Sequence, residues 1–200
     1  MTPSPCPLPS GERGRVRGGS TEFLMNIVLI GYRGSGKSTV GSKLAARLKR
    51  RFVDTDDLIE ERQGVPISDI VKSHGWDHFR KIEKAIIEEI SEGNHLIIAP
   101  GGGAVLDDDN VKFLRRNGFI IWLKADQQTL LERIQKDQAS SSRRPTLTGK
   151  GTLEEIEETI FQREPFYNKA SEVQIDTSIL SAEAIVESIL AALKEREGRT

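Results

Sequence analysis

The stretch GYRGSGKST at residues 31–39 constrains the fold more than any other part of the sequence. It matches the pattern G-x-x-x-x-G-K-[ST], in which the last two positions are Lys37 and Ser38. A short apolar run at residues 26–30 precedes it, and an amphipathic stretch follows it. A strand, a glycine-rich loop and a helix in this order form a phosphate-binding loop, because glycines let backbone N–H groups surround phosphate oxygens at a helix N-terminus. The sequence therefore predicts a nucleotide-binding domain rather than a chance glycine-rich turn.

The residue types within this loop also predict its contacts. The amine of Lys37 is expected to reach the β- and γ-phosphates of ATP, and the hydroxyl of Ser38 is expected to ligate Mg²⁺. A GTP-specific site has no support, since no D-x-x-G motif occurs and the nearest guanine-type motif, NKAS at 168–171, ends in serine. The residues expected around the phosphates are Gly34, Ser35, Gly36, Lys37, Ser38 and Thr39.

Beyond the loop, short apolar runs alternate with helical periodicities. Most of the runs are continuously apolar, which is typical of strands covered on both faces. Strand–helix alternation predicts a parallel sheet with helices on both sides, and ligands bind such sheets at the carboxyl ends of the strands. The strand-like runs lie at 26–30, 51–55, 95–99, 119–123 and 172–176.

Composition limits the other possibilities. The chain has 200 residues and a formal net charge of −1, which gives no electrostatic reason to expect nucleic acid as a partner. No apolar run approaches the roughly 20 residues that span a bilayer, so no membrane is expected either. The single cysteine, Cys6, cannot form an internal disulfide, which fits a cytoplasmic protein. We also expect a monomer.

The first 24 residues differ from the rest. They hold four of the eight prolines, four glycines and three arginines, and they offer little apolar surface to bury. This composition predicts a disordered leader without the apolar core of a secretory signal. Its arginines leave an organelle transit peptide open, but we favour a start-site artefact before Met25, with residues 25–200 as a single domain.

Two further segments suggest a second half of the site. Asp54 and Asp56 follow the second strand, and on an extended chain residues two apart point the same way. One of them is expected to face Mg²⁺ and the other an acceptor hydroxyl, unless the segment is merely a solvated acidic loop. The run IIAPGGGAV at 97–105 ends a strand with three glycines. It predicts either a tight turn or a very close approach of another group to the backbone.

Arginines complete the set of candidate residues. The segment FRKIE places Arg80 and Glu83 one helical turn apart, which in isolation indicates only an exposed ion pair. SRRP and QREPFY contribute Arg144 and Arg163, and the rigid guanidinium fork suits phosphate and carboxylate groups. The polar stretch 136–151 is too long for an ordinary connection and predicts either a mobile lid or a solvated loop.

Taken together, these segments resemble the shikimate kinase family. The motifs GYRGSGKSTVG, DTDDLIEERQG, FRKIE, GGGAV, RRPTL and REPFY occur in the family's order between about residues 26 and 194. The resemblance implies an α/β, three-layer P-loop kinase fold with a five-stranded parallel sheet of the nucleoside-monophosphate-kinase type and a lid at about 137–151. It implies transfer of the γ-phosphoryl group of ATP to the 3-hydroxyl of shikimate, with Mg²⁺ as cofactor, in aromatic amino acid biosynthesis.

The resemblance also implies a role for each matching residue. Asp54 would contact the metal through water, Asp56 would bind the acceptor hydroxyl, and Glu83 would orient Arg80. Arg80 and Arg163 would hold the shikimate carboxylate on a floor of glycines. The implied catalytic residues are Lys37, Asp56 and Arg144; the additional ATP contacts are Arg133 and Arg144; the metal ligands are Ser38 and Asp54; the shikimate contacts are Asp56, Arg80, Gly101, Gly102, Gly103 and Arg163.

Two positions depart from the family's usual pattern. Trp76 stands where a glutamate is usual, and Pro100 before the three glycines is also less usual. Two other interpretations stay open on sequence alone. One is a different small-molecule P-loop kinase, such as a gluconate-kinase-like enzyme, and the other is a non-catalytic nucleotide-binding module. The spacing of Asp54 and Asp56 and the pair of candidate carboxylate-binding arginines argue against the first, and the completeness of the site argues against the second.

Overall fold

A parallel five-stranded sheet forms the centre of the molecule. The computed structural model describes residues 25–136 and 153–198, and its strands are ordered β2-β3-β1-β4-β5. All four strand pairs are parallel, as the sequence predicts. The bounds are β1 Asn26–Ile30, β2 Arg51–Asp54, β3 Leu96–Ala99, β4 Gly118–Lys124 and β5 Val173–Asp176.

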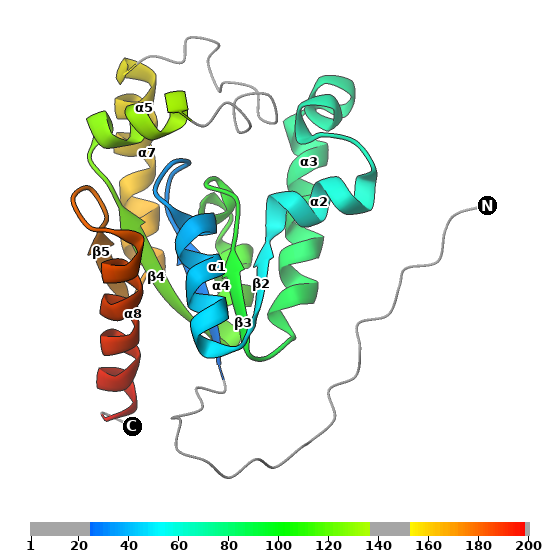
Figure 1. Ribbon diagram of the computed structural model, residues 1–200. Coiled ribbons are helices and arrows are strands. Elements are labelled where there is room, and N and C mark those ends of the chain that lie inside the picture. The colour runs from blue at the N-terminus through cyan, green and yellow to red at the C-terminus, as the bar shows by residue number, and fades with distance from the viewer. Residues whose placement is uncertain (1–24, 137–152, 199–200) are drawn as a thin grey trace.

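Helices cover both faces of this sheet, so the fold has three layers (Figure 1). Residues of the central strand β1 alternate between the two layers: Val28 and Ile30 belong to the core under α3, α4 and α7, whereas Ile27 and Leu29 belong to the core under α1 and α8. Both sets are fully buried, which explains why β1 is continuously apolar. The helices are α1 Lys37–Leu48, α2 Thr55–Gln63, α3 Ile67–Ser91, α4 Asp108–Arg116, α5 Gln127–Lys136, α7 Leu153–Ala170 and α8 Ala182–Glu197, with the 3₁₀ helix η1 at Ala104–Leu106.

The end of β2 differs from the sequence prediction. The strand ends at Asp54, whose side chain accepts a hydrogen bond from the backbone N–H of Asp56 at 3.1 Å and so caps α2. Asp56 therefore lies in the first turn of a helix, and the extended-chain argument for its direction is wrong. The capping aspartate and the acidic first turn are favourable at a helix N-terminus, which is why the helix begins so soon after the strand.

Two other local features set the position of the site. Helix α3 is kinked at Gly75, which has φ 81° and ψ 170°. Asp126 caps the N-terminus of α5, because its side chain accepts a hydrogen bond from the backbone N–H of Thr129 at 2.8 Å. Within the described ranges, none of the helices is long and apolar enough to cross a membrane. The predicted leader at 1–24 and the whole of the predicted lid at 137–151 lie outside these ranges.

Candidate active site

Two neighbouring pockets lie at the carboxyl ends of the strands. The first, the loop pocket, surrounds the glycine-rich loop between β1 and α1 and extends to Asp54 and Arg133. The second, the arginine pocket, lies between that loop, α2, α3, α7 and the three glycines after β3. Asp56, Arg33 and Ile67 line both pockets, so the two open onto each other at these residues. The arginine pocket is lined by Tyr32, Arg33, Asp56, Ile67, Trp76, Phe79, Arg80, Glu83, Gly101, Gly102, Gly103 and Arg163.

The glycine-rich loop has the backbone geometry that its motif predicts. Gly36 has φ 94° and caps the N-terminus of α1 without a side-chain hydrogen bond, so its backbone is shaped for a turn around an anion. Gly31 has φ 145°, and a Cβ there would lie 2.4 Å from the carbonyl oxygen of Leu123. The Lys37 amine donates to the carbonyl oxygens of Gly31 at 2.8 Å and Tyr32 at 3.1 Å, which holds the lysine against the loop.

Ser38 and Asp54 form a pair of hard oxygen ligands beside this loop. The Ser38 hydroxyl donates to Asp54 Oδ2 at 2.8 Å, and both residues line the loop pocket. One hydroxyl and one carboxylate fit the way Mg²⁺ is held in kinases, where phosphate and water oxygens complete the octahedron. Among the residues that the structure describes, no group of three or more His, Cys, Asp or Glu side chains could form a metal cage.

The arginine pocket is organised by an ion pair. The Arg80 guanidinium donates to the carboxylate of Glu83, and the Glu83 side chain is only 1% exposed. Burial raises the pKa of Glu83 above its ordinary value, while the charges of Arg80 and Arg163 oppose that rise. Glu83 Oε1 is buried and lacks a hydrogen-bond partner in the described part of the chain. The interpretation of this pair as an ordinary exposed ion pair is therefore wrong.

The three glycines form a tight turn, in which the Ala104 N–H donates to the Gly101 carbonyl at 2.9 Å, and they also allow the close approach of another group, so the two alternatives from the sequence both apply. A Cβ on Gly103 would lie 2.4 Å from Arg80 Nη2, so the guanidinium rests directly on the backbone. The Gly102 carbonyl accepts a hydrogen bond from the Tyr167 hydroxyl at 2.6 Å, and the Gly101 N–H donates to Thr55 Oγ1 at 3.0 Å. The loop is thus fixed by both β2–α2 and α7.

Most of the remaining candidates meet at these pockets. Asp56 from α2 and Arg163 from α7 line the arginine pocket with Arg80. Arg133 lines the loop pocket, where Nη1 donates to Gly34 O at 3.3 Å and Nη2 to Thr177 O at 2.6 Å. Arg144 lies outside the described residues.

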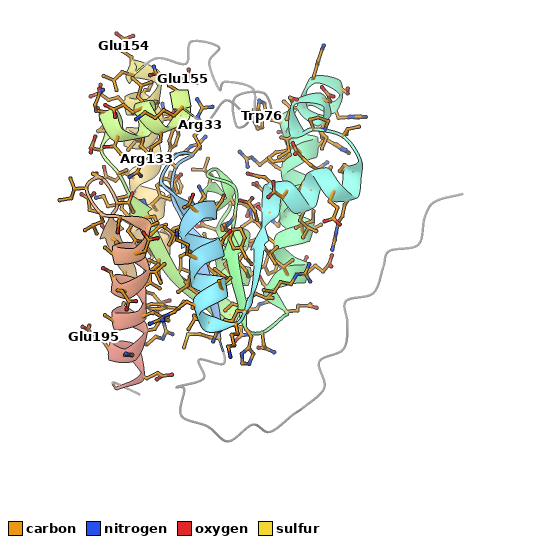
Figure 2. All side chains as sticks on the ribbon, in the orientation of Figure 1. Arg33, Trp76, Arg133, Glu154, Glu155 and Glu195 are labelled. Atoms are coloured by element: carbon orange, nitrogen blue, oxygen red, sulfur yellow. The ribbon has the colours of Figure 1, made fainter. Side chains whose placement is uncertain are left out.

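Sequence reasoning did not assign five of the side chains that line the arginine pocket to the site: Tyr32, Arg33, Ile67, Trp76 and Phe79. Figure 2 shows Arg33 beside the loop that follows β1 and Trp76 on the facing side, on the N-terminal half of α3. The Arg80 guanidinium lies 5.6 Å from the Trp76 ring centroid and 5.2 Å from that of Phe79. The available signals were weak, since Arg33 occupies an unspecified position of the loop motif and Trp76 follows a glycine.

Comparisons with known proteins agree with this geometry. The family model described as shikimate kinase matches residues 33–194. A shikimate kinase from Syntrophus aciditrophicus is 43% identical over 173 residues, which cover 82% of this chain and 89% of the relative. The structure of a shikimate kinase from Acinetobacter baumannii in complex with shikimate has a TM-score of 0.81 and 31% identity to this chain, and the match covers 88% of this chain and 96% of that one.

A more distant structure bears on the gluconate-kinase alternative. A gluconokinase from Sinorhizobium meliloti 1021 has a TM-score of 0.53 and 19% identity, covering 87% of this chain and 94% of that one. Identity at this level shows a shared fold alone. The family match and the first two relatives, by contrast, lead to one assignment: this chain belongs to the shikimate kinase family, whose members are ATP-dependent kinases.

Proposed function

We propose that this chain transfers the γ-phosphoryl group of ATP to the 3-hydroxyl of shikimate, with ATP in the loop pocket and shikimate in the arginine pocket. The observation that carries this assignment is that the two pockets meet at Asp56. A phosphoryl group needs to travel only from one pocket into the next, and the carboxylate at the junction can accept a hydrogen bond from the attacking hydroxyl.

Arg80 and Arg163 bind the carboxylate of shikimate. They come from different helices, α3 and α7, and line the same pocket. Glu83 keeps the Arg80 fork in one orientation, and the bare backbone at Gly103 gives that fork room. Gly101 and Gly102 form the rest of a floor without side chains, on which the ring lies. Arginine suits this task because its fork matches a carboxylate with two parallel hydrogen bonds.

Asp56 binds the 3-hydroxyl and takes its proton as the oxygen attacks the γ-phosphorus. The transition state of phosphoryl transfer is loose, so catalysis comes mostly from positioning and from stabilisation of charge. Lys37 holds the β- and γ-phosphates, and Arg144 supplies a further cation from the predicted lid. Arg133, which is fixed by Thr177 and Gly34, borders the nucleotide base.

Ser38 and Asp54 would hold Mg²⁺, the first directly and the second through water. A divalent ion is implied by the use of ATP, and the hydroxyl–carboxylate pair beside the loop supports magnesium in particular. When bound, the ion neutralises charge on the β- and γ-phosphate oxygens. Asp54 also caps α2, so the same carboxylate links the metal position to the helix that carries Asp56.

A coupled ADP-release assay tests this function. With ATP and Mg²⁺, we expect turnover with shikimate and none above background with gluconate. Absence of turnover with shikimate would overturn the proposal. Turnover with gluconate would favour the other small-molecule kinase, and nucleotide binding without turnover on either acceptor would favour the non-catalytic module.

We further propose that the enzyme is a cytoplasmic monomer that begins at Met25. The start at Met25 is supported by the composition of residues 1–24, which offer little apolar surface to bury. Sedimentation equilibrium of the purified protein and N-terminal sequencing of native protein test these two points. A native N-terminus at residue 1 would contradict the second.

A further inference from the structure

Arg33 lies where the two pockets meet. It is the third residue of the loop that follows β1, and it lines both the loop pocket and the arginine pocket. The other cationic side chains of the two pockets each line one of them: Lys37 and Arg133 line the loop pocket, and Arg80 and Arg163 line the arginine pocket. Among the described cationic side chains of the two pockets, Arg33 is therefore the one placed to contact a group that passes from one pocket to the other.

Among the residues that the structure describes, the Arg33 side chain also has no partner. Its Nε atom is buried without a hydrogen-bond acceptor, and no ion pair joins its guanidinium to the described residues. Two other arginines of the site are held by the protein, since Arg80 pairs with Glu83 and Arg133 bonds to Thr177. A partly buried guanidinium without an acceptor is costly. That cost is removed if the acceptor arrives with a ligand.

The chemistry of the junction identifies this acceptor as the transferring phosphoryl group. Asp56 lines both pockets and brings a negative charge to the place that the phosphoryl group must cross. Lys37 is bound to two carbonyl oxygens of the loop. In a loose transition state, negative charge is spread over three equatorial oxygens. A second cation on the loop side would balance Asp56, and an arginine fork can bind two such oxygens at once.

We propose that Arg33 is a further catalytic residue, whose guanidinium binds the equatorial oxygens of the phosphoryl group in transit. The bond from the γ-phosphorus to the β-bridging oxygen breaks, the bond to the shikimate oxygen forms, and Asp56 receives the hydroxyl proton. Arg33 forms no covalent bond and transfers no proton. Its effect is to stabilise charge, and the proposal rests on the function proposed above.

The test compares Arg33→Met, which keeps the length of the side chain without its charge, with Arg33→Lys, which keeps the charge without the fork. Arg47→Met is the matched control, because Arg47 is exposed on α1 outside both pockets. We expect kcat of R33M to fall about 10²- to 10³-fold, as for loss of one preorganised oxyanion donor. Both KM values should stay within about threefold of wild type, R33K should fall in between, and R47M should match wild type.

A transition-state mimic separates catalysis from a structural role. ADP with fluoroaluminate and shikimate imitates the phosphoryl group in transit, whereas ADP alone does not. R33M should lose affinity for the mimic by nearly the same factor as kcat and should bind ADP as wild type does. If R33M fails to fold, R33K carries the same comparison, with about tenfold lower kcat and lower affinity for the mimic.

Three results would overturn the assignment of Arg33. They are a kcat of R33M within about threefold of R47M, a rise in the KM for shikimate with kcat unchanged, and a loss of ADP affinity equal to the loss of kcat. In each of these cases wild type still turns over shikimate, so the proposed function survives. If wild type itself fails with shikimate, the proposed function is the part that is wrong.

Discussion

Arg80 is confined from four sides. Glu83 accepts its hydrogen bond from within the protein, and the rings of Trp76 and Phe79 lie 5.6 and 5.2 Å from its guanidinium carbon. The backbone of Gly103 lies on the remaining side. A charged fork fixed in this way loses little conformational freedom when a carboxylate binds to it, which is how preorganisation raises affinity. The orientation of Arg80 in the pocket thus depends on these four neighbours as well as on Arg80 itself.

Gly103→Ala tests this confinement. The new Cβ would lie 2.4 Å from Arg80 Nη2, so the guanidinium must move away from the floor. We expect the KM for shikimate to rise about tenfold or more while the affinity for ATP is unchanged. Gly198→Ala is the control, because a Cβ there meets nothing closer than 3.7 Å at the far end of α8. Equal kinetics for the two variants would contradict the role of Gly103.

The raised pKa of Glu83 predicts a pH dependence. Only ionised Glu83 holds Arg80 firmly, and burial raises its pKa above the ordinary glutamate value of 4.5. As pH falls through this raised pKa, kcat/KM for shikimate should fall. The titration of Glu83 affects folding stability in the opposite direction. The folded state retains the Glu83 proton to higher pH than the unfolded chain does, so this proton contributes to the free energy of unfolding at low pH. That contribution is lost as pH rises through the raised pKa of Glu83.

Glu83→Gln separates this group from others that titrate. We expect a lower kcat/KM for shikimate that no longer falls as the pH is lowered through the raised pKa of Glu83. The KM for ATP serves as the internal control, since Glu83 does not line the loop pocket. An acid limb that is the same in the variant and in wild type would assign the pH dependence to another residue.

Asp56→Asn tests the acceptor side of the reaction. Asparagine keeps the shape of the side chain at the junction of the pockets but cannot take up a proton at neutral pH. We expect kcat to fall by about 10²-fold or more, with ATP binding nearly intact by titration. Unchanged turnover would remove Asp56 from the mechanism.

At the scale of elements, the kink in α3 shapes the arginine pocket. Gly75 separates the first turns of α3 from the part that carries Phe79, Arg80 and Glu83. Its φ of 81° and ψ of 170° are open almost exclusively to glycine. The kink directs Trp76 into the pocket lining next to Arg80. In a straight helix, Trp76 would have a different orientation relative to Arg80.

Gly75→Ala should strain the kink without a steric clash, because a Cβ there meets nothing within 4 Å. We expect a loss of about 1–3 kcal/mol in the free energy of unfolding, measured with urea. Gly198→Ala, at a residue with φ −66°, should be close to neutral. If G75A and G198A have the same free energy of unfolding, the backbone conformation at position 75 does not require glycine.

The sequence predicts some elements well for local reasons. The short apolar runs identify all five strands to within about one residue. The central strands β1, β3 and β4 are nearly continuous apolar runs because both of their faces are buried, whereas the edge strands β2 and β5 contain exposed polar residues. The glycine-rich motif places the loop and the start of α1, since both depend on residues that are adjacent in sequence. The spacing of Arg80 and Glu83 correctly predicts their pairing, because one helical turn separates them.

Other features were not predictable from local pattern. Asp56 lies in α2 because Asp54 caps that helix at once, so the tight turn replaces the expected extended segment. The burial of Glu83 depends on α3 packing beside the glycines after β3, a contact between distant segments. Arg33 occupies a motif position that accepts any residue, so only the meeting of the two pockets reveals it. The roles of these residues in catalysis stay predictions.

At the scale of the whole molecule, the strand order brings the site together. β1 lies between β3 and β4, so the phosphate-binding loop after β1 adjoins the glycines after β3. β2 flanks β3 and delivers Asp54 and the start of α2 to the same edge of the sheet. Both pockets thus follow from strands that end side by side, a general property of parallel sheets. The central claim of this account is that one phosphoryl group crosses from one pocket to the other, at Asp56.

Identification of the product tests that claim most directly. The purified protein is incubated with ATP, Mg²⁺ and shikimate, and the product is analysed by phosphorus and proton nuclear magnetic resonance. We expect one phosphomonoester whose phosphorus couples to the proton on carbon 3 of the ring, formed in equal amount with ADP. A phosphate on the 4- or 5-hydroxyl, or ADP formed without a phosphorylated acceptor, would contradict it.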